Sequence, residues 1–120
     1  MAPDIERLLL VDEDDLLAQI GRDIAGASAR SEPRAHLIKM ARDWLSINSV
    51  QFRDAICANP AVRAAMKLSP GRERQLASVV AVSDVLASVL IGIPVVTIAV
   101  LLVRNGIDGL CADRALDASE

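Results

Sequence analysis

Between Val85 and Val103 the chain runs for nineteen residues without a charge, with the sequence VLASVLIGIPVVTIAVLLV. The mean hydropathy of this run is roughly 2.8 per residue, a value at which a membrane span has to be considered. The run is also long enough to cross a bilayer as one helix. Gly92, Ile93 and Pro94 interrupt it near the centre, which suits two buried helices joined by a turn equally well. Whether this segment lies in lipid, in a core or against a partner decides the broad class of protein.

The composition favours helices. Of the 120 residues, 52% are hydrophobic and only 2% are aromatic, and nineteen are alanine, which has a high helix propensity and is depleted in strands. Eleven arginines against two lysines, together with the alanine content, are typical of a GC-rich bacterial genome. The length fits one domain, over residues 1–120. We predict an all-α fold, a compact bundle of six or seven short helices around a hydrophobic C-terminal αα-hairpin.

Apolar residues at helical spacing predict amphipathic helices within residues 4–68 and an apolar hairpin within residues 72–112. Asp12 is a candidate helix cap, and Asn59-Pro60 and Ser69-Pro70 each place a capping residue before a proline. Gly106 is a candidate stop signal. The predicted later elements are helices from Arg34 to Ile47, Val50 to Cys57, Pro60 to Leu68, Arg72 to Ile91 and Pro94 to Val103, with a loop over 31–33 and a closing turn from Ile107 to Leu116. The β-branched residues Val95 to Ile98 leave a strand open as an alternative.

The charge and the cysteine content limit which compartments and which classes of partner are expected. The net charge is −3, and no stripe of basic and aromatic residues exists to follow a phosphate backbone, so nucleic-acid binding is not expected. The acidic N-terminal residues do not resemble a signal peptide, and we predict a cytoplasmic protein, with inner-membrane association as the alternative. Cys57 and Cys111 are 54 residues apart and form no CxxC pair. We expect two buried free thiols, with a disulfide between them as the alternative.

Residues 8–17, LLLVDEDDLL, resemble the first strand and acidic pocket of a response-regulator receiver domain, in a chain of suitable length. The resemblance implies a phosphoacceptor at Asp54 and a later strand in IPVVTIAV. The spacing does not fit, because that segment begins 39 residues after Asp54, and no Lys-Pro follows it. We interpret the four acids from Asp12 to Asp15 as the first turn of a helix.

No combination of residues in the sequence predicts catalysis. His36 is the one histidine, the acids at 12–15 lack the glycine and the final glutamate of an EF-hand, and no GxSxG, phosphate-binding or dinucleotide motif is present. Cys57 or Ser83 could serve as a nucleophile only if the fold placed His36 beside it. We therefore predict no enzymatic function, no cofactor, no metal and no small-molecule substrate.

Asp84 is the least expected residue, because it is the one charge in an apolar region from Leu76 to Val103. A carboxylate there is costly unless it is paired or exposed. It could pair with Arg53 or Arg63, lie exposed at a helix edge, or act as a functional acid facing a cavity or a partner.

The sequence favours a non-catalytic helical interaction module: an adaptor, an oligomerisation unit or an accessory subunit of a larger bacterial complex. Its partner would be another protein or a second copy, bound through an aliphatic surface. The alternative is a small membrane-inserting protein with a kinked span or hairpin at 76–103. The candidate interaction residues are Asp84, Ser88, Val95, Val96, Leu101 and Leu102.

Overall fold

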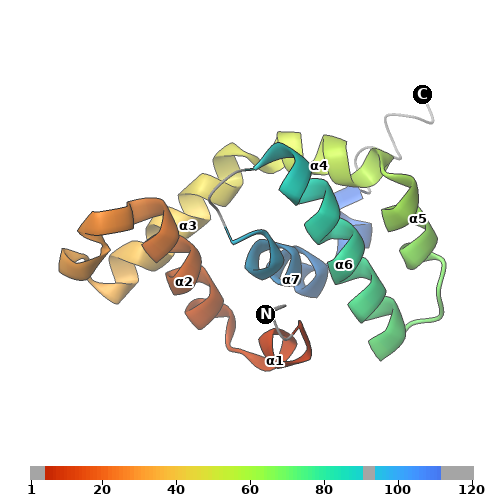
Figure 1. The fold of residues 1–120 in the computed structure, drawn as a ribbon, viewed down its shortest axis with the longest axis horizontal. Helices are drawn as coiled ribbons and strands as arrows, with labels where there is room; N and C mark the ends of the chain where they lie inside the picture. The colour runs from red at the N-terminus through yellow and green to blue at the C-terminus, as the bar shows by residue number, and fades with distance from the viewer. Residues whose placement is uncertain (1–4, 91–93, 112–120) are drawn as a thin grey trace.

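The computed structural model describes residues 5–90 and 94–111, and the regular structure in both ranges is entirely helical (Figure 1). The predicted all-α fold is confirmed. A last helical stretch covers residues 107–111. The elements before it are α1 (Ile5–Leu10), α2 (Glu13–Ala25), the 3-10 helix η1 (Gly26–Ser31), α3 (Arg34–Ile47), α4 (Ser49–Ala58), α5 (Pro60–Met66), α6 (Arg72–Val89) and α7 (Val95–Asn105).

The start of α5 has the predicted capping chemistry. The Oδ1 atom of Asn59 accepts hydrogen bonds from the N–H groups of Ala61 and Val62, at 2.9 and 3.1 Å. Pro60 occupies the first helical position, where the missing N–H would have had no partner within the helix. The end of α7 also follows the prediction. The N–H of Gly106 donates to carbonyls in the last turn of this helix, which ends just before Gly106.

The helix α6 begins at Arg72, as predicted, but Ser69 and Pro70 do not cap it. These two residues lie in the turn after α5. Gly71 precedes the helix with a φ of 149°, a conformation that residues with a Cβ rarely adopt. The chain therefore uses a glycine, and not the serine, to change direction into α6.

Two further sequence alternatives are resolved. Residues Val95 to Ile98 form the first turn of α7, so the strand interpretation is wrong. Ser31, expected at the start of a loop, is the last residue of the 3-10 helix η1. The predicted helix end at Ile91, the turn at 92–93 and the closing residues 112–116 lie outside the described residues.

The long apolar run divides between two packed helices. Its described residues end α6 and form most of α7, and α6 and α7 pack against each other (Figure 1). Among the helices that the structure describes, none is long and apolar enough to cross a membrane. The side chains of both helices join one buried cluster with α2, α4 and α5. Its largest fully buried side chains are Leu16, Ile20, Phe52, Ile56, Val62, Val79, Val82, Leu86, Ile98, Val100 and Leu101.

The α2–α3 pair is packed unusually closely at Gly21. This glycine is buried in the middle of α2, and a Cβ placed on it would lie 2.2 Å from the backbone carbonyl oxygen of Leu37 in α3. Only a residue without a side chain allows the two helices to approach so closely. Gly21 therefore sets the distance between α2 and α3.

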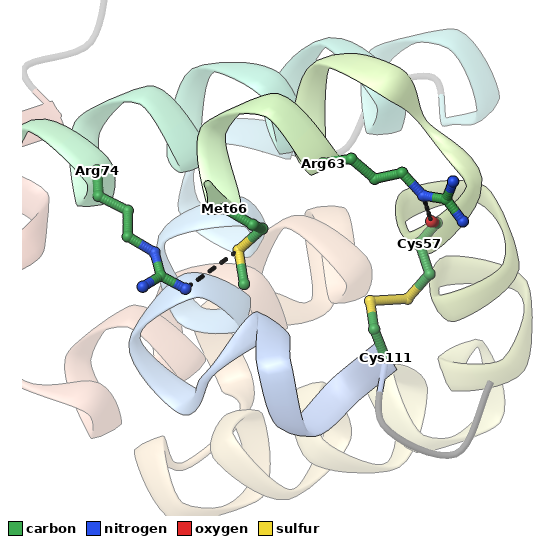
Figure 2. Close-up of a disulfide and its surroundings, with 5 residues drawn as sticks. All are labelled: Cys57, Arg63, Met66, Arg74 and Cys111. Carbon is green, nitrogen blue, oxygen red and sulfur yellow. Dashed lines mark hydrogen bonds between the residues drawn. A yellow bond between two sulfur atoms is a disulfide. The ribbon is translucent and has the colours of Figure 1, made fainter. Parts of the chain in front are cut away.

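The two cysteines form a disulfide, so the expectation of free thiols is wrong (Figure 2). Cys57 lies in the last turn of α4, and Cys111 lies in the helical stretch after α7, with their Cα atoms 5.6 Å apart. The fold brings together two residues separated by 54 positions. Sequence spacing carries no information about that approach, because it depends on how α5, α6 and α7 return the chain to α4.

Candidate interaction surface

The residues considered for nucleophilic catalysis do not meet. His36 lies exposed on α3, where its Nδ1 contacts the Glu32 carboxylate. Cys57 is held in the disulfide. Ser83 lies on the buried side of α6, and its hydroxyl has no hydrogen-bond partner among the described residues. In the part of the chain that the structure describes, neither candidate nucleophile is paired with His36.

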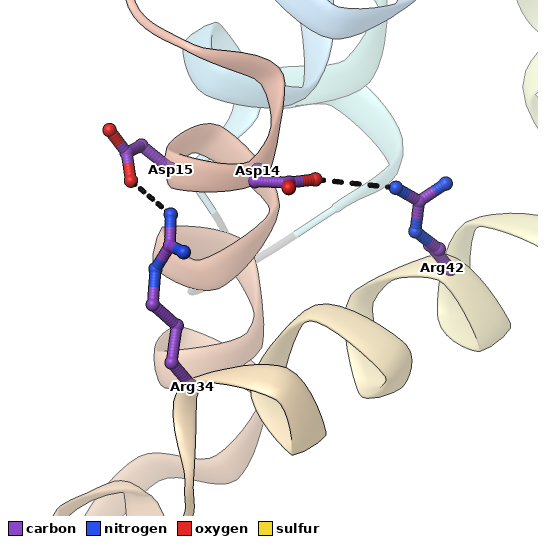
Figure 3. A network of polar contacts seen from close by, with 4 residues as sticks. All are labelled: Asp14, Asp15, Arg34 and Arg42. Atoms are coloured by element: carbon purple, nitrogen blue, oxygen red, sulfur yellow. Dashed lines mark hydrogen bonds and ion pairs between the residues drawn. The ribbon is translucent and has the colours of Figure 1, made fainter.

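Asp14 and Asp15 of the acidic cluster lie in the first turn of α2, and their carboxylates meet arginines of α3 (Figure 3). Asp15 pairs with Arg34, and Asp14 pairs with Arg42 at 3.4 Å. Both pairs are largely exposed, so each contributes about 0–1 kcal/mol to stability. Within the described ranges no group of three or more histidine, cysteine or acidic side chains is arranged to hold a metal ion. The cluster thus helps to orient α2 on α3.

Asp84 lies exposed on α6. Of the three interpretations left open by the sequence, pairing with Arg63 is not what the structure shows, since the Nε of Arg63 donates to the backbone carbonyl of Cys57 (Figure 2). No residue in the described part of the chain forms an ion pair or a hydrogen bond with Asp84. The exposed carboxylate keeps its hydration.

Because Asp84 is exposed, the substitution Asp84→Ala should change the free energy of unfolding by less than about 0.5 kcal/mol. A buried ion pair would instead make its loss cost about 3–5 kcal/mol. Urea denaturation of the variant and the native chain distinguishes these values, and a loss of several kcal/mol would show that Asp84 is buried and paired.

The other candidate residues divide between surface and core. Ser88 is exposed, and its hydroxyl donates to the Val85 carbonyl one turn earlier. Val95 and Val96 are half-buried at the start of α7, and Leu102 is half-buried further along it. Leu101 is only 2% exposed, so including it in the interaction surface was wrong. The residue faces the core because α7 turns that side of the apolar run toward α2 and α6.

An apolar groove runs between α5 and α6, which lie side by side (Figure 1). Its volume is about 630 Å³. Val80 on one wall is 48% exposed, and Leu68 beyond the end of the other is 39% exposed. The groove lies open to solvent and is lined by Ala61, Ala64, Ala65, Leu68, Glu73, Leu76, Ala77, Val80, Ala81 and Asp84. We call it the α5–α6 groove.

One wall of this groove corresponds to a periodic pattern in the sequence. Ala77, Ala81 and Asp84 recur at helical spacing and form one narrow face of small or polar residues on α6. That face is now one wall of the groove. The exposure of Val80 and the opposite wall on α5 could not be predicted, because both depend on how the turn at Gly71 places the two helices.

In two other clefts most of the charged side chains are paired within the chain. One, of about 770 Å³, lies beside the start of α6, where Arg72 pairs with Glu6. Arg74 in the same cleft bonds to Asp108 at 3.2 Å and contacts the Met66 sulfur (Figure 2). The second lies between α1, α2 and the start of α7 and is lined by both Val95 and Val96. By contrast, the two acids of the α5–α6 groove form no bond with any other described residue.

Comparison with known proteins assigns no family to this chain: no protein-family model matches it, and neither curated proteins nor solved structures give a significant match.

Proposed function

We propose that this chain is a non-catalytic helical interaction module that binds a partner protein through the α5–α6 groove. The observation that carries this proposal is the open apolar groove itself. Its walls are aliphatic, yet the fold leaves Val80 and Leu68 substantially exposed to water. Exposed apolar surface of this kind commonly marks a protein interface.

The shape of the site supports a protein partner. Two adjacent helices form a shallow channel that an apolar helix face can enter, one of the recurring modes of peptide recognition. Burying Val80 alone would contribute about 1 kcal/mol, given the half of its surface that remains exposed. Several such contacts together are enough for a specific but reversible complex, as an adaptor or accessory subunit requires.

The disulfide bears on the compartment predicted from the sequence. Disulfides persist mainly in oxidising compartments. The Cys57–Cys111 bond therefore weighs against the cytoplasmic localisation predicted from the sequence. The oxidation state of Cys57 and Cys111 in the cells that produce the chain decides between the cytoplasm and an oxidising compartment.

The proposal is tested by site-specific photo-crosslinking in the cells that produce the chain. A benzophenone amino acid placed at Val80 should give one discrete adduct with another protein. The matched control is Val89, which is also on α6 and is 42% exposed but does not line the groove. Mass spectrometry of the adduct identifies the partner. No adduct at Val80, or the same adducts at both positions, would contradict the proposal.

A further inference from the structure

We infer that the occupant of the α5–α6 groove is an amphipathic helix with an aliphatic face and a basic residue at each end of that face. This inference rests on the proposed function and specifies the partner of the same site. Four features of the groove support this inference: the placement of its two acids, the absence of opposing charge among its described lining residues, the shape of its walls, and its poor fit to a second copy of the chain.

The two acids of the groove occupy its two ends. Glu73 and Asp84 are both on α6 and both line the groove, eleven residues apart in the sequence. Eleven residues are about three turns of helix, or about 16 Å along the axis, so both carboxylates lie on the same face. Val80 is exposed between them. A partner that covers Val80 across the groove must therefore pass near both carboxylates.

No basic side chain lines the described part of the groove to neutralise these acids. The arginines next to Glu73 have other partners, since Arg72 pairs with Glu6 and Arg74 with Asp108. Glu73 and Asp84 themselves bond to no other described residue. Their charges thus give the groove a negative potential at both ends, which favours a ligand with positive charge at matching positions.

The walls of the groove suit a helix better than an extended segment. An extended peptide is held by backbone hydrogen bonds to the edge of a sheet, and two helices offer no such edge. Five alanines line the groove at helical spacing, Ala61, Ala64, Ala65, Ala77 and Ala81. Small side chains let a third helix approach closely, while leucine-sized side chains of that helix fill the space above the alanines.

A second copy of this chain fits the groove poorly. Two copies related by a twofold axis would place the same patch on itself, with the α6 helices either antiparallel or parallel. Glu73 of each copy would then face Asp84 of the other, or each acid would face its own equivalent. Two opposed pairs of like charges at the ends of a small apolar interface disfavour that dimer.

The test measures binding of synthetic helical peptides to the full oxidised chain by fluorescence anisotropy. The first peptide has a leucine and alanine face with arginines about three turns apart at its ends. The second has glutamates in place of the arginines. The first should bind with a Kd of about 1–100 μM, and the second at least about tenfold more weakly. Added salt should reduce the difference in Kd between the two peptides, because Glu73 and Asp84 are exposed and their charges are screened.

Charge reversal in the chain provides the matched comparison. The double variant Glu73→Lys/Asp84→Lys should prefer the glutamate peptide. Glu13→Lys/Asp23→Lys changes the net charge equally on α2, away from the groove, and should keep the native preference. Thermal melting checks that both variants fold.

Three results would overturn the inference. The first is equal binding of both peptides, and the second is binding of neither. The third is a dimer, seen by sedimentation, that Val80→Glu abolishes and Val89→Glu retains, since a second copy would then occupy the groove. If neither peptide binds while crosslinking at Val80 still captures a protein, the proposed function stands and only this partner chemistry fails.

Discussion

Reduction of the Cys57–Cys111 disulfide should lower the free energy of unfolding by about 4 kcal/mol. The bond joins residues 54 positions apart, and in the chain-entropy model the stabilisation grows with the length of the loop that the bond closes. A loss of that size is a large part of the stability of a typical small domain. Urea denaturation with and without dithiothreitol measures it directly.

The double variant Cys57→Ala/Cys111→Ala is the control. It should be about as unstable as the reduced native chain and should not respond to dithiothreitol. It should also lose a little more stability, because Cys57 is 6% exposed and its sulfur helps to fill the core. Titration of thiols in the unreduced, denatured protein should find none at Cys57 or Cys111. Two titratable thiols there, or equal stability with and without reductant, would contradict the disulfide.

Replacing Gly21 with alanine should destabilise the chain by about 3 kcal/mol. A glycine inside a helix normally costs stability relative to alanine, so the usual effect of this substitution is a gain. Here the new Cβ would lie 2.2 Å from the Leu37 carbonyl oxygen. Because the obstructing atom belongs to the backbone, α2 and α3 must move apart to admit the methyl group. The midpoint of urea denaturation measures the loss.

Gly109→Ala is the matched control for Gly21→Ala. Gly109 lies in the helical stretch after α7, and a Cβ built on it has no neighbour within 4 Å. This substitution should leave stability unchanged or raise it by up to about 1 kcal/mol. If both variants were equally stable, the close approach of α2 and α3 would not exclude a side chain at position 21.

The helices could be predicted wherever a local signal specifies their ends. Asn59 caps α5 through its own side chain, and Gly106 ends α7, because each acts on residues within one turn. Ser69 has similar local chemistry, but the nearby Gly71 sets where α6 begins. The start of α6 at Arg72 was predicted, but the capping role offered for Ser69 is wrong, because Gly71 is the residue that directly precedes the helix.

The candidate site was predictable only in part, for the same physical reason. Periodicity places Ala77, Ala81 and Asp84 on one face of α6 without reference to any other element. The opposite wall of the groove requires knowing where α5 lies. Gly21 and the Cys57–Cys111 bond also depend on contacts between segments far apart in the sequence. Leu101 was placed on the surface wrongly for a related reason. Hydropathy alone does not say which side of an apolar helix faces the core.

The disulfide has a topological consequence for the groove. Together with the backbone from Cys57 to Cys111, it closes a covalent ring that contains α5, α6 and α7. Both walls of the α5–α6 groove belong to this ring, whereas α1, α2 and α3 lie outside it. A single break in the backbone anywhere within the ring, such as the turn at Ser69 to Gly71, would leave the two walls joined in one molecule. Their connection therefore does not depend on the short turn alone.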